Sequence, residues 1–219
     1  YTIDTSTSSG TTSYDLITDI EYALMEPPTP GAWTGTDQFD MDCIVGAIER
    51  RRNLFLRETG IVLTTATKVI AFPATDGRVT LPSTTIAIRR ATWTPDATLI
   101  AGSLHRDDEW GANHYARTWT TPGTPQNYSV SAVPPVTMQF IPPASAGGTL
   151  DTVQITRAAA IVAGSDTPLG IPDDWVWVIK WGVLADLLAV DGLSADPVRA
   201  AYCEARWNQG LMAAKAAVV

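Results

Sequence analysis

The spacing of apolar residues changes twice along this chain of 219 residues. Between residues 12 and 60, apolar positions recur every three or four residues, which is typical of helices with one buried face. From residue 61 to about 165 they alternate with polar positions or gather in β-branched runs, a pattern that predicts strands. Helical spacing returns from 170 to 218. The order predicts an α+β fold with an N-terminal helix pair, a central antiparallel β region and a C-terminal helix pair.

Capping residues and breakers place the ends of the N-terminal helices. We expect Ser13 to cap a helix from Tyr14 to about Glu26, because the proline-rich segment 27–31 cannot continue it. Asp37 is expected to cap a second helix that runs to about Glu58. Gly60 follows as its stop signal.

The β region divides into runs separated by turn residues. The segment 103–115 is polar and predicts a short helix or ordered loop at the sheet edge. A further extended piece is expected near Trp119, and Ala146–Gly148 is the expected turn between the last two strands. The predicted strands cover residues 61–72, 78–82, 85–94, 97–102, 127–133, 136–142 and 149–162.

The C-terminal helices have clear start signals. Pro172 with Asp173 and Asp174 predicts one helix, which Gly192 closes. A capping side chain followed by proline at 196–197 predicts the last helix, to about residue 217. No linker is long enough to separate independent folds, so the segments 12–60, 61–165 and 170–218 are expected to form one domain over 1–219.

Aromatic and basic side chains on the helices are the candidate interface. Trp177 and Trp181 share one face of the helix after 172, while Trp175 points elsewhere, so that helix is apolar on more than one face. Packing within the chain and contact with a partner both explain this, and both interpretations stay open. The basic run 50–52 predicts a solvated helix face or a subunit contact. The candidate interface residues are Trp175, Trp177, Trp181, Tyr202, Trp207, Arg50, Arg51 and Arg52.

Charge and composition exclude several classes of function. The net charge is −8 and charged residues make up 17%. This argues against nucleic-acid binding, because phosphate binding needs a basic surface. The longest apolar run, 175–190, is interrupted by Lys180, Gly182 and Asp186, so no membrane partner is expected. No signal-peptide pattern stands at the start. Cys43 and Cys203 are expected to be two buried thiols.

Motifs that carry chemistry are few. His105 and His114 lack the helical spacing of a metal pair, and no phosphate-binding loop or nucleophile elbow occurs in the sequence. We therefore expect no metal, no cofactor and no catalytic residue. A hydrolytic enzyme that uses Asp107, Asp108 or Glu109 stays an alternative, because paired carboxylates can act as acid and base.

From about Thr67 onward, the order of several short motifs resembles a phage head–tail adaptor family, the neck proteins of tailed phages. The match covers about 140 residues by order and spacing of elements. It rests on Val79–Pro82 before Ile86–Ile88, the polar stretch Ser103–Trp110, Pro125–Tyr128, the proline-framed strand Met138–Pro143, the helix entry Ile171–Leu188, and the last helix with Tyr202, Glu204, Arg206 and Gly210.

The resemblance implies a structural virion protein and not an enzyme. Members of that family form rings between the portal and the tail, with DNA passing through the lumen without sequence-specific binding. It implies a homo-oligomeric ring of about twelve copies, with the portal protein and a downstream tail protein as partners. The location implied is the neck of the virion, after synthesis in the host cytoplasm. A tail-tube or tail-completion protein is the alternative.

Overall fold

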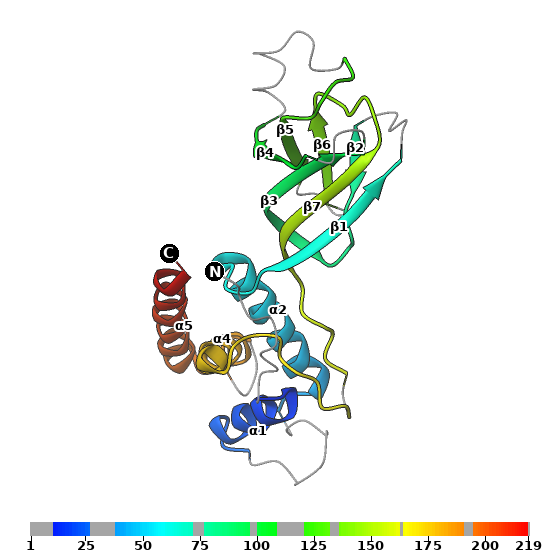
Figure 1. Ribbon diagram of the computed structural model, residues 1–219. Helices are drawn as coiled ribbons and strands as arrows, with labels where there is room; N and C mark the ends of the chain where they lie inside the picture. Colours follow the sequence, from blue (N-terminus) through cyan, green and yellow to red (C-terminus); the bar gives the residue numbers. More distant parts are fainter. Residues whose placement is uncertain are drawn as a thin grey trace. The chain divides into compact units, whose positions relative to one another are not determined.

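A computed structural model gives the fold of the protein (Figure 1). It describes residues 11–26, 38–71, 77–96, 100–108, 121–131, 136–162, 164–190 and 195–218. Within these residues the fold is mixed α+β, with four α-helices and seven strands. Two compact units form: a helical unit from Tyr1–Val62 and Ala158–Val219, and a β unit from Leu63–Arg157. The expectation of one domain over 1–219 stays a prediction.

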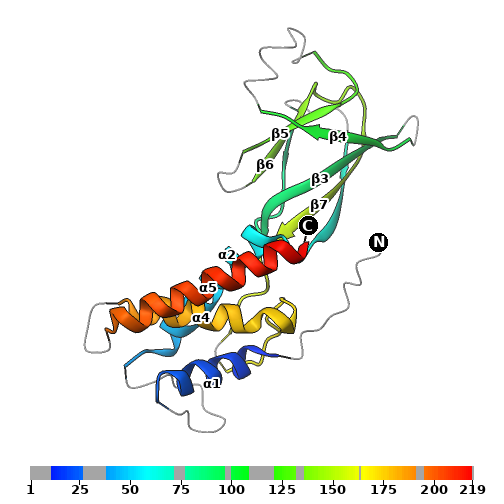
Figure 2. The same cartoon turned by 90° about the vertical axis from the view of Figure 1, so that its left-hand side faces the viewer.

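The helical unit is built around one central helix. Its elements are α1 (Ser13–Ala23), α2 (Met41–Thr59), a short 3-10 helix η1 (Asp173–Trp175), α4 (Val176–Leu188) and α5 (Pro197–Val218). Helix α4 contacts α1, α2 and α5, and α1 and α5 lie on either side of it (Figure 2). Packing against these three helices within the chain explains the apolar faces of α4 that are buried. Segments from the first and the last part of the sequence therefore form this unit together.

Helix α1 begins one residue earlier than its predicted start, and Ser13 is not its cap. Thr12 is the N-cap, and its hydroxyl accepts a hydrogen bond from the Asp15 amide. The Asp15 carboxylate in turn accepts hydrogen bonds from the Thr12 amide (3.1 Å) and hydroxyl (2.8 Å), which completes a capping box. A cap at Ser13 could not form this box, because the third residue after it is Leu16, which has no carboxylate. Ser13 is buried and exchanges hydrogen bonds with Thr167 instead.

The other helix ends follow the predictions more closely. Helix α2 begins at Met41 with Asp40 as its N-cap, while the predicted cap Asp37 lies outside the described residues. Gly60 ends α2 with φ 60°, a left-handed conformation that glycine adopts without steric cost. The Asp196 carboxylate accepts a hydrogen bond from the Arg199 amide (3.0 Å), which confirms the start of α5. Helix α4 ends at Leu188, before Gly192, which lies outside the described residues.

The β unit is one seven-stranded sheet with the order β1-β7-β3-β4-β5-β6-β2. All of its pairs are antiparallel except β4–β5, so the prediction of an antiparallel region is wrong for that pair. The strands are β1 (Thr64–Ile70), β2 (Arg78–Thr80), β3 (Thr85–Pro95), β4 (Gly102–Arg106), β5 (Asn127–Ser131), β6 (Thr137–Ile141) and β7 (Gly148–Thr156).

The segment 103–115 begins as strand β4, which corrects its prediction as a helix or loop. Leu104 is its one buried apolar residue, so too little alternation exists to reveal a strand in the sequence. Part of the strand expected over 97–102 and the extended piece near Trp119 lie outside the described residues. Gly148, expected in the turn before the last strand, is the first residue of β7.

The core of the β unit depends on a close approach at Gly148. The rings of Trp93 and Phe140 lie 5.1 Å apart between centroids, and both side chains are buried. A Cβ added at Gly148 would lie 2.5 Å from the Trp93 ring and 2.6 Å from the Thr94 carbonyl oxygen. Only glycine leaves room for the indole against strand β7, so this position limits what the core tolerates.

The substitution Gly148→Ala tests that packing. We expect it to lower the free energy of unfolding of the β unit by about 1–3 kcal/mol, because an extra methyl group forces Trp93 or the backbone to move. Gly102→Ala is the matched control, since its nearest neighbour is the Trp93 carbonyl oxygen at 3.8 Å. Urea unfolding followed by tryptophan fluorescence measures both. Equal effects of the two variants would contradict the packing described.

Candidate assembly surface of the helical unit

Trp207 lies where three helices of the helical unit meet. It belongs to α5 and is 2% exposed, with its ring centroid 6.2 Å from that of Phe55 on α2. Gly182 on α4 lets the indole approach the helix backbone, because a Cβ there would lie 2.6 Å from the ring. The Arg51 guanidinium lies 5.1 Å from the ring centroid. Trp207, predicted as an interface residue, is thus a core residue of its own chain.

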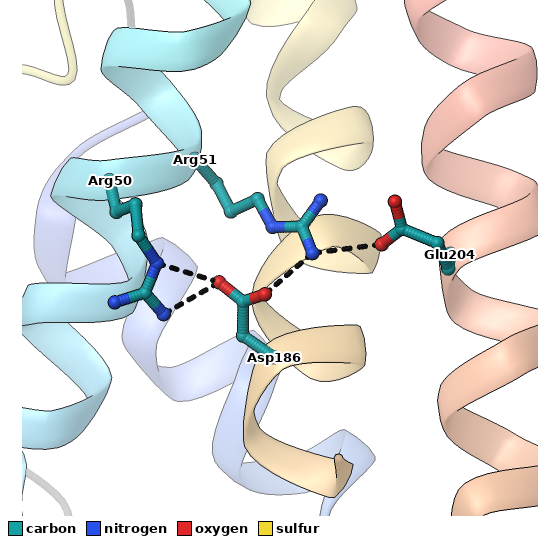
Figure 3. Close-up of polar contacts among 4 residues, drawn as sticks. All are labelled: Arg50, Arg51, Asp186 and Glu204. Atoms are coloured by element: carbon teal, nitrogen blue, oxygen red, sulfur yellow. Dashed lines mark hydrogen bonds and ion pairs between the residues drawn. The ribbon is translucent and has the colours of Figure 1, made fainter. Parts of the chain in front are cut away.

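The basic run 50–52 begins with two arginines in an ion-pair network (Figure 3). Arg50 donates to Asp186 from Nε (3.1 Å) and Nη2 (2.7 Å). Arg51 donates from Nη2 to Asp186 (2.5 Å) and to Glu204 (2.8 Å), so its guanidinium on α2 joins α4 and α5 through one nitrogen. Burial raises the pKa of Asp186, but the hydrogen bonds from Arg51 and Arg50 outweigh it and hold that pKa below its ordinary value.

Arg52 points into the helical unit. Its side chain is buried, and Nη2 donates to the Ala159 carbonyl (2.7 Å) while Nη1 reaches the Leu169 carbonyl at 3.5 Å. Burial lowers the pKa of this guanidinium, partly offset by Glu49. The Glu49 carboxylate also accepts from the Ile161 amide (2.7 Å). Arg52 and Glu49 therefore fasten α2 to the segment that follows β7. Of the three arginines in the run 50–52, only Arg50 fits the predicted solvated helix face, because its side chain is 64% exposed.

Two of the five predicted aromatic residues lie at the surface. Trp177 is 43% exposed and Tyr202 is 54% exposed. Trp181 is half-buried and meets Tyr202 edge to face, with 5.7 Å between ring centroids. Arg206 lies over the Tyr202 ring, and its Nε donates to the Tyr202 hydroxyl (3.1 Å). Trp175 is half-buried, with its ring centroid 6.4 Å from that of Phe55. Trp177 and Tyr202 are the side chains that a partner could reach.

Helix α1 supplies the other wall of a groove beside Trp177. The groove has a volume of about 500 Å³ and lies between α1 and α4. Asp19 at its edge pairs with Lys180 (3.3 Å). Sequence analysis missed α1 as part of this surface, although the polar, exposed positions Asp15 and Asp19 one turn apart mark its outer face. The groove is lined by Thr11, Leu16, Asp19, Ala23, Val176, Trp177, Lys180 and Trp181.

The carboxylates proposed for a hydrolase line an open hollow in the β unit. Asp107 and Asp108 share this hollow of about 700 Å³ with Arg78 and Arg106. Asp107 accepts hydrogen bonds from the Asp108 amide (2.9 Å) and from Asn127 (3.3 Å), so it fastens the end of β4 to β5. Glu109 and His114 lie outside the described residues.

The remaining candidate groups are possible metal ligands and the two cysteine thiols. Among the residues that the structure describes, no group of three or more His, Cys, Asp or Glu side chains could hold a metal ion. Both cysteines are free thiols. Cys203 is buried as predicted, and burial raises its pKa, but Cys43 is exposed on α2, which corrects that prediction.

Two tryptophans that look alike in the sequence have opposite surroundings, which substitution can test. We expect Trp207→Ala to lower the free energy of unfolding of the helical unit by about 3–5 kcal/mol, because it empties the space between three helices. Trp177→Ala, the matched control, is expected to cost about 1 kcal/mol or less, since much of that side chain is already in water. Calorimetry measures both. A small loss for Trp207→Ala would refute its place in the core.

The Asp186 network has a pH dependence whose sign follows from its depressed pKa. The stabilisation is present above the unfolded-state pKa of about 3.9 and is lost as the pH falls through the lower folded-state pKa. We expect Asp186→Asn to lower the free energy of unfolding at pH 7 by about 1.5–3 kcal/mol, the range for hydrogen bonds to charged groups. The difference from wild type should shrink below about pH 4. Urea unfolding between pH 7 and pH 2.5 measures it, and a constant difference would contradict the ion pairing.

Comparison with known proteins identifies the family of the chain. No helix in the described part of the chain is long and apolar enough to cross a membrane. No curated protein matches the chain. The model of the SU10 adaptor protein family matches residues 11–218, which takes in both the helical unit and the β unit. That family comprises structural adaptors of phages and is not an enzyme family. Because the match covers nearly the whole chain, the protein belongs to the SU10 adaptor protein family.

Proposed function

We propose that this protein joins the portal to the tail of a phage particle, as a ring through which DNA passes. The observation that carries the proposal is the match to the phage adaptor family over residues 11–218. It agrees with the order of motifs from Val79 to Gly210 that resembles head–tail adaptors. The protein is then a neck component of the virion, made in the host cytoplasm, with the portal protein and a downstream tail protein as neighbours.

The charge of the chain suits a channel for DNA. Acidic residues outnumber basic ones in the helical unit, while the two kinds nearly balance in the β unit. A ring of about twelve such copies repeats that acidic surface, which repels the phosphate backbone and lets the duplex pass without sequence-specific contacts. The basic run 50–52 supports this, because Arg51 and Arg52 are engaged inside the chain. A lumen lined by those arginines would contradict the proposal.

A closed ring also needs two unlike surfaces on each copy. In cyclic symmetry above two-fold, one face of each subunit meets a different face of the next. The helical unit has exposed apolar side chains on α1, α4 and α5, while the outer side of α2 is polar. This difference supports a head-to-tail arrangement. A tail-tube or tail-completion role uses the same kind of assembly, and position in the particle separates these roles.

Imaging of assembled particles tests the proposal. We expect density for the protein, marked by a fused tag, at the junction of portal and tail, and we expect particles without it to have filled heads and no attached tail. Density confined to the distal tail would refute the connector role. The double variant Asp107→Asn with Asp108→Asn is the control for enzymatic function. Normal particles that lose infectivity with this variant would favour a hydrolase.

A further inference from the structure

The middle of helix α2 contains a glycine that the chain itself does not explain. Gly46 is exposed, and a Cβ added there would find no atom of the described residues within 4 Å. Glycine is much less favourable than alanine inside a helix, because it has more backbone freedom to lose. By contrast, Gly182 and Gly210 in the other helices each admit a tryptophan or valine side chain of this chain. The bare surface at Gly46 therefore indicates a contact from outside the chain.

The outer face of α2 has a defined pattern around this glycine. Cys43, Gly46, Arg50 and Arg57 follow at helical spacing, and all four are exposed. The opposite face of α2 is buried in the helical unit, with Ile44, Ile48 and Phe55 among its fully buried side chains. We call the exposed set the α2 outer face. Gly46 leaves a gap on this face, with Cys43 one turn before it and Arg50 one turn after it, that a large apolar group could fill.

The groove between α1 and α4 has the complementary features. Trp177 lines it with 43% of its surface exposed, and Leu16 and Val176 form part of its apolar wall. Asp15 and Asp174 are exposed on the flanking elements, while Asp19 at the edge pairs with Lys180, so the surroundings have a net negative charge. Arg50 and Arg57 on the α2 outer face pair with Asp186 and Glu58 within the chain but keep 64% of their side chains exposed. Carboxylates beside the groove can therefore attract them across a contact.

We infer that the α2 outer face of one copy docks on the α1–α4 groove of the next copy, with Trp177 covering Gly46. The two surfaces differ, so the contact is heterologous and can repeat around a ring. Their opposite charges favour a second copy of this acidic chain as the occupant, because random contact between two such chains is repulsive. The inference rests on the proposed ring and adds which surfaces build it.

Thiol cross-linking in assembled particles tests the contact directly. Cys43 is exposed one turn from Gly46, while Cys203 is buried, so only Cys43 is accessible. Ala23→Cys places a second thiol in the lining of the groove and keeps Trp177. In particles that contain this variant, a short bifunctional maleimide should link chains through Cys43 and give a ladder of covalent multimers. Tyr202→Cys is the matched exposed control on α5 and should remain monomeric. Monomers only from Ala23→Cys, or equal ladders from both variants, would overturn the inference.

A second pair of variants separates assembly from folding. We expect Gly46→Glu to keep or raise the melting temperature of the helical unit, since glutamate favours helix, yet to lower incorporation into particles at least tenfold. Ala205→Glu places the same charge on an exposed position of α5 and should leave incorporation unchanged. Normal incorporation of Gly46→Glu would overturn this inference. Failure of the proposed function looks different, because the wild-type tag would then lie away from the portal–tail junction.

Discussion

The close approach of Trp207 to the backbone of α4 determines how the helical unit is built. The indole reaches α4 because Gly182 has no side chain, and Arg51 lies over the ring. Glycine inside a helix costs about 1 kcal/mol relative to alanine, and burial of a large aromatic side chain more than offsets that cost. Gly210 on α5 repeats the arrangement in the other direction, since it admits Val178 and Trp177 of α4. Together the two glycines let α4 and α5 pack at short distance.

The ion pairs around Asp186 act on this packed core by fixing how the helices are rotated. Apart from Lys180 and Asp186, helix α4 is apolar, so hydrophobic burial alone would tolerate several rotations about its axis. Asp186 reaches Arg50 and Arg51 together only when one face of α4 turns toward α2, and Arg51 reaches Glu204 only when α5 is correctly placed. A carboxylate left unpaired at this half-buried site is costly, so the wrong rotations are disfavoured.

The sequence predicted the helices and strands better than it predicted which side chains are buried. Helix starts were predictable where capping chemistry is local, as at Asp196, and the stop at Gly60 was equally clear. The parallel pairing of β4 with β5 was not, because strand direction depends on contacts between distant segments. Trp177 and Trp207 look equivalent in sequence, and only the position of α5 on α4 makes one a surface residue and the other a core residue. Burial depends on tertiary packing, which periodicity in a single helix does not contain.

The three helical glycines show how the same packing logic extends beyond the chain. Gly182 and Gly210 lie on faces where another helix of the unit presses against them, so their cost is offset within the fold. Gly46 lies on the opposite side of α2 from the core, where the described residues offer nothing to pack against it. Trp177 has the converse property, since Gly210 holds one edge of its ring while much of the indole remains in water. In the docking that we propose, a neighbouring copy would fill the gap at Gly46 and cover the exposed part of Trp177.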